Sequence, residues 1–250
     1  MSTFNVKIDT SPTFSSVVVE CIYNAIGDGI KEDIALHKLR THNSIPSRIW
    51  DLINTNICER LNTYDCTTTT PKRGPWEIVV IFEKETEYIY TIMREKRFRE
   101  LKKSIPKRNR MHYIDLFAHH LNPDLLAPVG QTTMIPVRFD DEDKLMESIQ
   151  RILAGFSEEA REIKRHALIL FESSNYDLTS VRVAIVDTNL DIVAEQDWSK
   201  YIPVQESSIT EKVIDPHNPS NTPSRGLKLT EKAAARKNAD YKKRETERIS

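Results

Sequence analysis

Glycine is scarce in this chain, with only six glycines among 250 residues. Loops that hold phosphate groups need clustered glycine, because their backbone N–H groups must come close to the ligand. The sequence contains neither G-x-G-x-x-G nor G-x-x-x-x-G-K-[ST], and it also lacks H-E-x-x-H, G-x-S-x-G and internal repeats. These absences argue against the standard nucleotide-binding folds and leave the catalytic residues, and whether the protein is an enzyme, unknown.

Cysteine is equally sparse, and its three positions, Cys21, Cys58 and Cys66, form no C-x-x-C pair. An odd number of thiols at these spacings favours reduced cysteines in a cytosolic protein over a disulfide framework or a zinc site. Cys21 and Cys58 fall within helical patterns, so we expect them in the core. We predict no metal ion and no cofactor.

Long apolar runs are also missing. No stretch approaches the roughly 18 residues of a membrane helix, and Met1 to Lys7 contain no apolar core of a signal peptide. We therefore expect a cytoplasmic protein with no membrane segment. The hydrophobic fraction of 39% is enough for a core. The net charge of −1 confines any nucleic-acid binding to a local surface.

Hydrophobic periodicity predicts an α+β fold in which helices pack on antiparallel β-strands. Helices are expected near residues 13–26, 45–61, 94–103, 112–121 and 140–153. A β-hairpin is expected near 76–93 and an antiparallel meander near 166–194.

The chain is expected to contain one globular body at residues 1–202, and a division into two subdomains near 125–140 is open. Residues 203–226 are rich in proline, asparagine and serine and favour a flexible linker. Residues 227–250 form a disordered basic C-terminal tail, at best a marginal helix.

Positive charge gathers directly after the predicted hairpin, where nine of the seventeen residues from Arg94 to Arg110 are Lys or Arg. Lys96, Arg99 and Lys103 stand at i, i+3 and i+7, a stripe that suits the phosphates of a nucleic-acid backbone. The predicted contacts are Lys96, Arg99, Lys103, Lys107, Arg108 and Arg110. The alternative is a solvated polar face, paired with the acidic helix that begins at Asp140.

A second group of residues predicts a pocket. Asn54 falls at the edge of an apolar helix face, between Trp50 and Cys58. A buried asparagine must be hydrogen-bonded, so it is either a structural amide or a pocket residue. Arg94 falls beside the apolar face of its own helix and needs a carboxylate or a bound anion. The pocket candidates are Arg48, Asp51, Asn54 and Arg94.

Two further patterns bear on metal chemistry. His112, Asp115 and His119 share one arc of a helix, but the two histidines lie about two turns apart, so a solvent-facing polar stripe is preferred over a ligand set. Around the hairpin stand the acidic residues Glu77, Glu83, Glu85 and Glu87, with Lys84. A metal-dependent nuclease needs carboxylates and a lysine at strand ends, although exposed turns commonly carry such residues.

The segments Ile49–Ile57 and Thr91–Phe98, followed by the pair His112-Tyr113, stand in an order that resembles uncharacterised bacterial proteins found with phage and mobile elements. The similarity covers roughly residues 15–200. It implies a bacterial cytosolic setting and a role in phage–host conflict, and no catalytic residue is carried over with it.

We therefore expect an intracellular bacterial binding or regulatory protein that acts on DNA or RNA and is linked to phage defence or a mobile element. One alternative is a metal-dependent nuclease with carboxylates around the hairpin. The other is a protein-interaction module that binds no nucleic acid and docks a protein partner through the C-terminal tail or the acidic helix.

Overall fold

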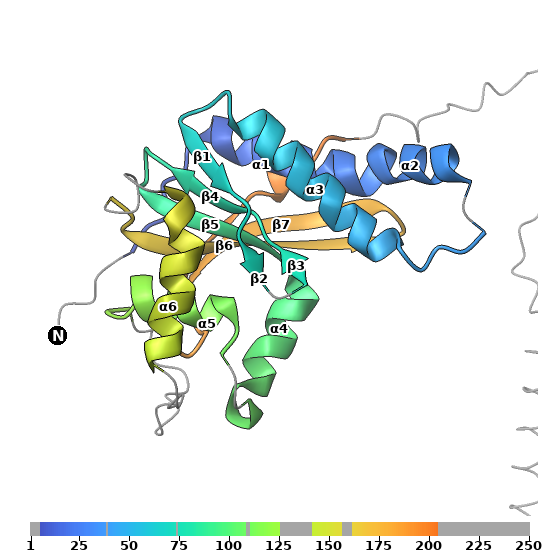
Figure 1. Cartoon of the computed structure of the whole chain (residues 1–250). Coiled ribbons are helices and arrows are strands. Elements are labelled where there is room, and N and C mark those ends of the chain that lie inside the picture. The colour runs from blue at the N-terminus through green and yellow to red at the C-terminus, as the bar shows by residue number, and fades with distance from the viewer. Residues whose placement is uncertain are drawn as a thin grey trace, which may run out of the picture. The chain divides into compact units, whose positions relative to one another are not determined.

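The computed structural model describes residues 6–38, 40–73, 75–108, 111–125, 142–156 and 162–204. At its centre lies a six-stranded sheet with the strand order β1-β4-β5-β6-β7-β8 (Figure 1). The strands are β1 (Cys66–Thr69), β4 (Val80–Glu83), β5 (Tyr88–Arg94), β6 (Arg165–Ser174), β7 (Asp177–Val186) and β8 (Ile192–Asp197). A separate ribbon pairs β2 (Lys72–Arg73) with β3 (Trp76–Glu77).

One pair of strands in this sheet is parallel. β5 and β6 run parallel over seven residue pairs, from Tyr88 opposite Arg165 to Arg94 opposite Phe171. All other neighbours in the sheet are antiparallel. A tight turn cannot join parallel neighbours, so the chain between β5 and β6 must cross over the sheet.

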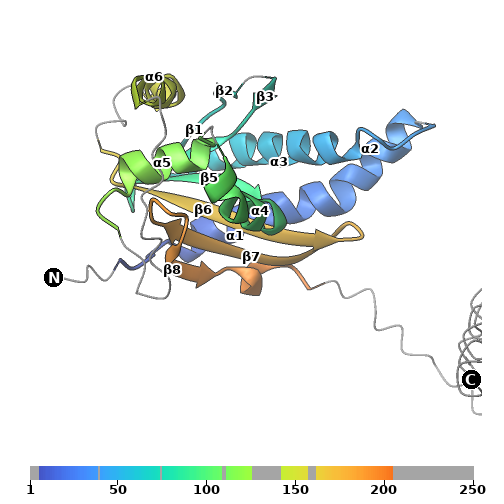
Figure 2. The same cartoon turned by 90° about the horizontal axis from the view of Figure 1, so that it is seen from below.

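Helices cover both faces of the sheet. One face carries α1 (Pro12–Asn24), the π-helical turn η1 (Ala25–Gly29), α2 (Ile30–His37) and α3 (Ile45–Leu61). The crossover supplies the other face with α4 (Glu95–Ser104), α5 (Tyr113–Leu121) and α6 (Glu142–Leu153). The segment from α1 to α2 runs alongside α3 (Figure 2).

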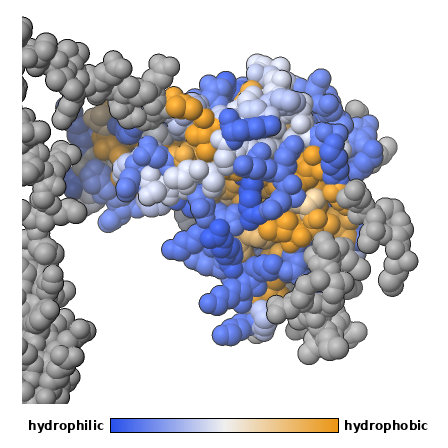
Figure 3. All heavy atoms as spheres, turned by 180° about the vertical axis from the view of Figure 1, so that it is seen from behind, coloured by the Kyte–Doolittle hydropathy of each residue, from blue (hydrophilic) through white to orange (hydrophobic). Residues whose placement is uncertain are grey.

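Two hydrophobic clusters result, one on each face of the sheet. Side chains of β5 alternate between them: Tyr90 and Ile92 join the cluster of α1 and α3, whereas Ile89 and Met93 join the cluster of α4 and α5. Strands buried on both faces read as continuous apolar runs, as β4 and β5 do. On the face shown in Figure 3, several apolar areas lie among hydrophilic side chains.

The predicted α+β class is confirmed, as are the hairpin, formed by β4 and β5, and the meander of β6, β7 and β8. The expectation of antiparallel strands missed the β5–β6 pair. The proposed division near 125–140, the linker and the tail lie almost entirely outside the described residues and stay predictions. In the described part, no helix is long and apolar enough to cross a membrane.

A buried polar cluster joins α5 to the sheet. Asn122, fully buried, donates to the backbone oxygens of His166 (3.0 Å) and Val186 (2.9 Å) and accepts the His166 backbone N–H (3.1 Å). The His166 ring stacks on Phe117 at 4.7 Å and its Nε2 lies 2.9 Å from Thr91 Oγ1. The side-chain amide of Asn122 thus takes the place of backbone hydrogen bonds between His166 of β6 and Val186 of β7.

Burial lowers the pKa of His166 from 6.5 to about 3, because the enclosed ring cannot be hydrated when charged. The pKa of His166 is lower in the folded state than in the unfolded state, so the neutral ring favours folding. Its contribution to the free energy of unfolding is fully present above about pH 6.5 and is lost as the pH falls. Lowering the pH from 7 to 5 is expected to cost roughly 2 kcal/mol through this group. Urea unfolding across this pH range measures it.

The matched variant is His166→Gln, which has no titrating ring. Its unfolding free energy should lack this part of the acid dependence, whatever its stability at pH 7. Parallel pH profiles for the two proteins would contradict the assignment.

Candidate nucleic-acid interface

A cleft of about 1170 Å³ lies between α3, the β2–β3 ribbon and the junction of β5 with α4. Its lining includes Trp50, Asp51, Asn54 and Glu59 of α3, Lys72, Trp76 and Glu77 of the ribbon, Arg94 and Arg97 at the junction, and His112 and Tyr113. Three of the four predicted pocket residues, Asp51, Asn54 and Arg94, therefore share one cavity. Arg48 does not line it and instead pairs with Asp33 at 2.9 Å.

Helical spacing explains the α3 wall. Ile49, Ile53 and Ile57 recur every four residues, so they form one buried stripe that faces the core. One position further along, Trp50 and Asn54 form the neighbouring stripe, which is half-buried and lines the cleft. The expected placement of Asn54 at the edge of the apolar face is confirmed.

Arg94 is the last residue of β5 and directly precedes α4. Its guanidinium lies 5.5 Å from the centroid of the Phe171 ring, and its Nη1 donates to Ser173 Oγ at 3.5 Å. Burial lowers its pKa. Among the described residues no carboxylate forms an ion pair with Arg94, so the expected choice between a carboxylate and a bound anion as its partner stays a prediction.

Aromatic rings border the same cleft. Trp50 packs edge-on against Phe171, with ring centroids 5.6 Å apart, so one phenylalanine contacts both Trp50 and Arg94. Trp76, on the β2–β3 ribbon, is 60% exposed. A tryptophan this exposed is uncommon, because burying its large ring is strongly favourable.

The predicted phosphate contacts differ in the partners that the structure gives them. Arg99 pairs with Glu95 (3.0 Å) and Glu172 (3.2 Å), although its side chain stays largely exposed. Arg108 donates twice to Asp115, at 2.6 and 2.9 Å, and is therefore a structural residue rather than a free phosphate contact. Arg110 lies outside the described residues.

The remaining three residues form what we call the lysine ridge, which consists of Lys96, Lys103 and Lys107. All three are exposed, and none has an ion-pair partner within the part of the chain that the structure describes. The neighbouring Lys102 instead pairs with Asp191 at 2.6 Å. The predicted pairing with the acidic helix that begins at Asp140 involves side chains outside the described residues.

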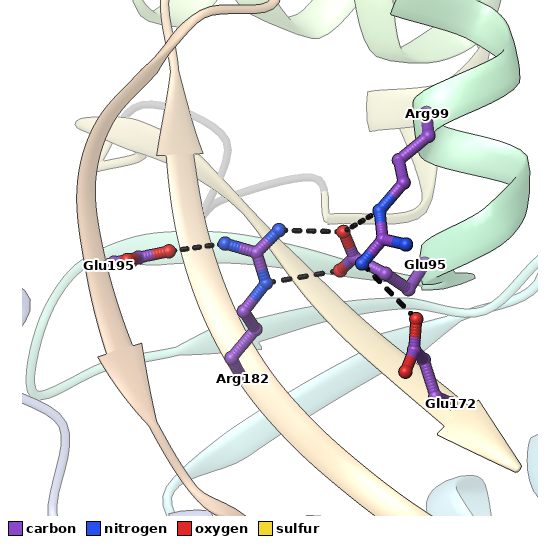
Figure 4. Close-up of polar contacts among 5 residues, drawn as sticks. All are labelled: Glu95, Arg99, Glu172, Arg182 and Glu195. Atoms are coloured by element: carbon purple, nitrogen blue, oxygen red, sulfur yellow. Dashed lines mark hydrogen bonds and ion pairs between the residues drawn. The ribbon is translucent and has the colours of Figure 1, made fainter.

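An ion-pair network anchors α4 to the sheet (Figure 4). Glu95, only 5% exposed, accepts two hydrogen bonds from Arg182 of β7, at 2.8 and 3.0 Å, and one from Arg99. Arg182 also pairs with Glu195 of β8. Burial opposes the charge on Arg182, but its hydrogen bonds and attraction to both carboxylates outweigh burial and raise its pKa.

The expected solvent-facing stripe of His112, Asp115 and His119 is wrong. His112 is the N-cap of α5, where its Nδ1 accepts the Ile114 N–H at 3.4 Å. Asp115 is 2% exposed and accepts the His112 backbone N–H at 2.7 Å as well as both bonds from Arg108. This capping box faces inward because α5 packs against the sheet with that side.

The hairpin carboxylates do not converge. Glu83 is buried and accepts hydrogen bonds from Thr86 (2.8 Å) and Tyr90 (2.9 Å), and burial raises its pKa. Glu77 lines the cleft, and Glu87 pairs with Lys164. Among the described residues, no group of three or more His, Cys, Asp or Glu side chains is placed to hold a metal ion. The nuclease alternative has no metal site there.

These features define an α+β protein with a mixed sheet and an open, mixed-charge cleft. The chain belongs to a family of unknown function (DUF5986), whose model matches residues 7–248. Comparisons with curated proteins and with solved structures found no match. The family match supports the expected membership of a family without known function, and it contains nothing about phage or mobile elements.

The network predicts a large loss of stability in Glu95→Ala, because Arg182 and Arg99 lose their shared carboxylate while Arg182 stays partly buried. We expect the free energy of unfolding to fall by about 3 kcal/mol. Glu100→Ala, on the exposed side of the same helix, should change it by less than about 0.5 kcal/mol. Urea denaturation of both variants makes the comparison, and equal losses would mean that the network does not anchor α4.

Proposed function

We propose that this protein binds nucleic acid through the lysine ridge, with Lys96 and Lys103 on α4 and Lys107 on the turn that follows, and through the adjoining cleft. The observation that carries the proposal is the division of charge on one helix. Arg99 and Lys102 are occupied by Glu95, Glu172 and Asp191. Within the described ranges the three lysines of the ridge have no ion-pair partner, so their charges can meet phosphates.

The support of α4 favours a binding surface over a solvated face. The Glu95 network joins this helix to β6, β7 and β8, so the lysines project from a fixed support rather than a loose segment. Cations held on a rigid element lose little entropy when a phosphate binds. Lys96 and Lys103 therefore both stand on a helix that is anchored to the sheet.

Arg97 connects the lysine ridge to the cleft. It lies on α4 and lines the cavity beside Arg94. Its contact with Glu100 is long, at 3.5 Å, and both side chains are more than half exposed. Such a surface pair stabilises the protein little. A phosphate can therefore displace Glu100, which makes a continuous cationic path from the ridge into the cleft.

The biological setting is proposed from the sequence resemblance alone. It comprises a bacterial cytoplasmic protein whose binding serves phage defence or a mobile element. DNA and RNA are both open as ligands at the ridge, because phosphate contacts carry no base information. Docking of a protein partner through the tail stays a prediction.

Charge reversal on the ridge tests the proposal. Lys96→Glu combined with Lys103→Glu should weaken binding at least about tenfold and reduce the slope of log K against log salt by about 2, because two phosphate contacts are lost. The measurement is fluorescence anisotropy with labelled 20-nucleotide DNA and RNA across a salt series, in the presence of EDTA.

The matched control is Lys31→Glu combined with Lys38→Glu on and beside α2, which makes the same change in net charge on the opposite face of the sheet. This control should bind nearly as the unaltered protein does. Equal losses in the two variants would indicate a nonspecific effect of net charge. No binding by the unaltered protein at low salt would overturn the proposal.

A further inference from the structure

Arg94 offers an anion an oriented and incompletely used binding group. A guanidinium has five N–H donors in a planar fork, and the described residues give Arg94 one long hydrogen bond, to Ser173. The Phe171 ring lies against the guanidinium at 5.5 Å and restricts its plane. A half-buried charge needs a counter-ion, and because the described residues give Arg94 none, a phosphate that binds the fork would supply that partner.

The two walls of the cleft differ in charge. Arg94 and Arg97 stand on the wall formed by β5 and α4, whereas Asp51, Asn54 and Glu59 stand on α3. A simple polyanion would be attracted by the first wall and repelled by the second. A strand of nucleic acid suits both, because its phosphates can follow the arginines while its base edges meet carboxylate and amide groups. Carboxylates accept from the cytosine amino group, and asparagine pairs with adenine.

Trp76 adds a stacking surface at the edge of this cleft. Its ring is held on the short β2–β3 ribbon and is 60% exposed. Exposed aromatic rings beside a cationic groove are the common feature of proteins that bind single strands, because every base presents a face that can stack. In a duplex that face is covered by neighbouring bases.

The volume of the cleft agrees with a segment of chain rather than a single small molecule. At about 1170 Å³ it exceeds the roughly 300–1,000 Å³ typical of small-ligand pockets. We infer that the cleft binds a single-stranded stretch of nucleic acid, with a phosphate at Arg94 and a base stacked on Trp76. This inference rests on the proposed function and names its substrate class.

The test compares a labelled single-stranded 12-mer with the duplex of the same sequence, on the full chain, in EDTA and at low salt. Trp76→Ala should weaken single-strand binding at least about fivefold, since one stacked base is lost, and leave duplex binding unchanged. Trp76→Phe should retain most of the affinity. Tyr64→Ala, which removes another exposed aromatic ring, is the matched control and should bind normally.

Arg94→Gln provides an independent variant, expected to weaken single-strand binding about tenfold and to reduce its salt slope by about 0.7. Quenching of tryptophan fluorescence by the single strand should be reduced in Trp76→Ala. Because Trp76 is exposed, its replacement should leave thermal unfolding unchanged, which keeps the test valid even if Arg94→Gln fails to fold.

The outcomes separate the two proposals. If the lysine variants lose binding while Trp76→Ala binds the single strand normally, the cleft inference is overturned and nucleic-acid binding through the lysine ridge stands. Preference of the unaltered protein for the duplex overturns the cleft inference in the same way. If the unaltered protein binds neither probe, both fall.

Discussion

The parallel pairing of β5 with β6 is the constraint on which the rest of the structure depends. Since parallel neighbours need a crossover, the chain between them carries α4 and α5 to the face opposite α1 and α3, and both faces become buried. The same pairing sets Arg94, at the carboxyl end of β5, opposite Phe171 of β6. Ligand sites in sheets commonly open at such ends, and the cleft does so here.

Helix α4 shows how a charged segment is divided by its packing. It buries only Glu95, Phe98 and Leu101, too few apolar groups to hold it firmly. The Glu95 network compensates, because a buried carboxylate with two arginine partners resists displacement from the sheet. Arg99 and Lys102 form the ion pairs that hold the helix on the sheet, whereas the side chains of the lysine ridge are exposed. One run of basic residues thus has a side that forms ion pairs with the sheet and a side that is exposed.

Local patterns were sufficient for much of the fold and part of the site. Spacing of apolar residues identified the helices, the hairpin and the meander, and the helical wheel placed Asn54 beside Trp50 in what proved to be a cleft. Predictions for single side chains failed where packing between elements decided the partner. The sequence predicted Arg108 to be a phosphate contact and Asp115 to be an exposed acid, yet the two form a bidentate ion pair in which Asp115 is buried. The β2–β3 ribbon beside the cleft was missed because two-residue strands carry no periodicity.

From its residues alone, the chain defines an α+β protein with a concentrated basic helix and few of the glycines that phosphate loops require. Those properties depend on residues within a few positions of one another, so periodicity and charge spacing reveal them. Tertiary structure alone decided that β5 and β6 are parallel, that Glu95 pairs with Arg182 across 87 residues, and that Arg94 has no described carboxylate partner. Contacts between distant segments depend on how buried faces and charges are satisfied together, and no local pattern contains that information.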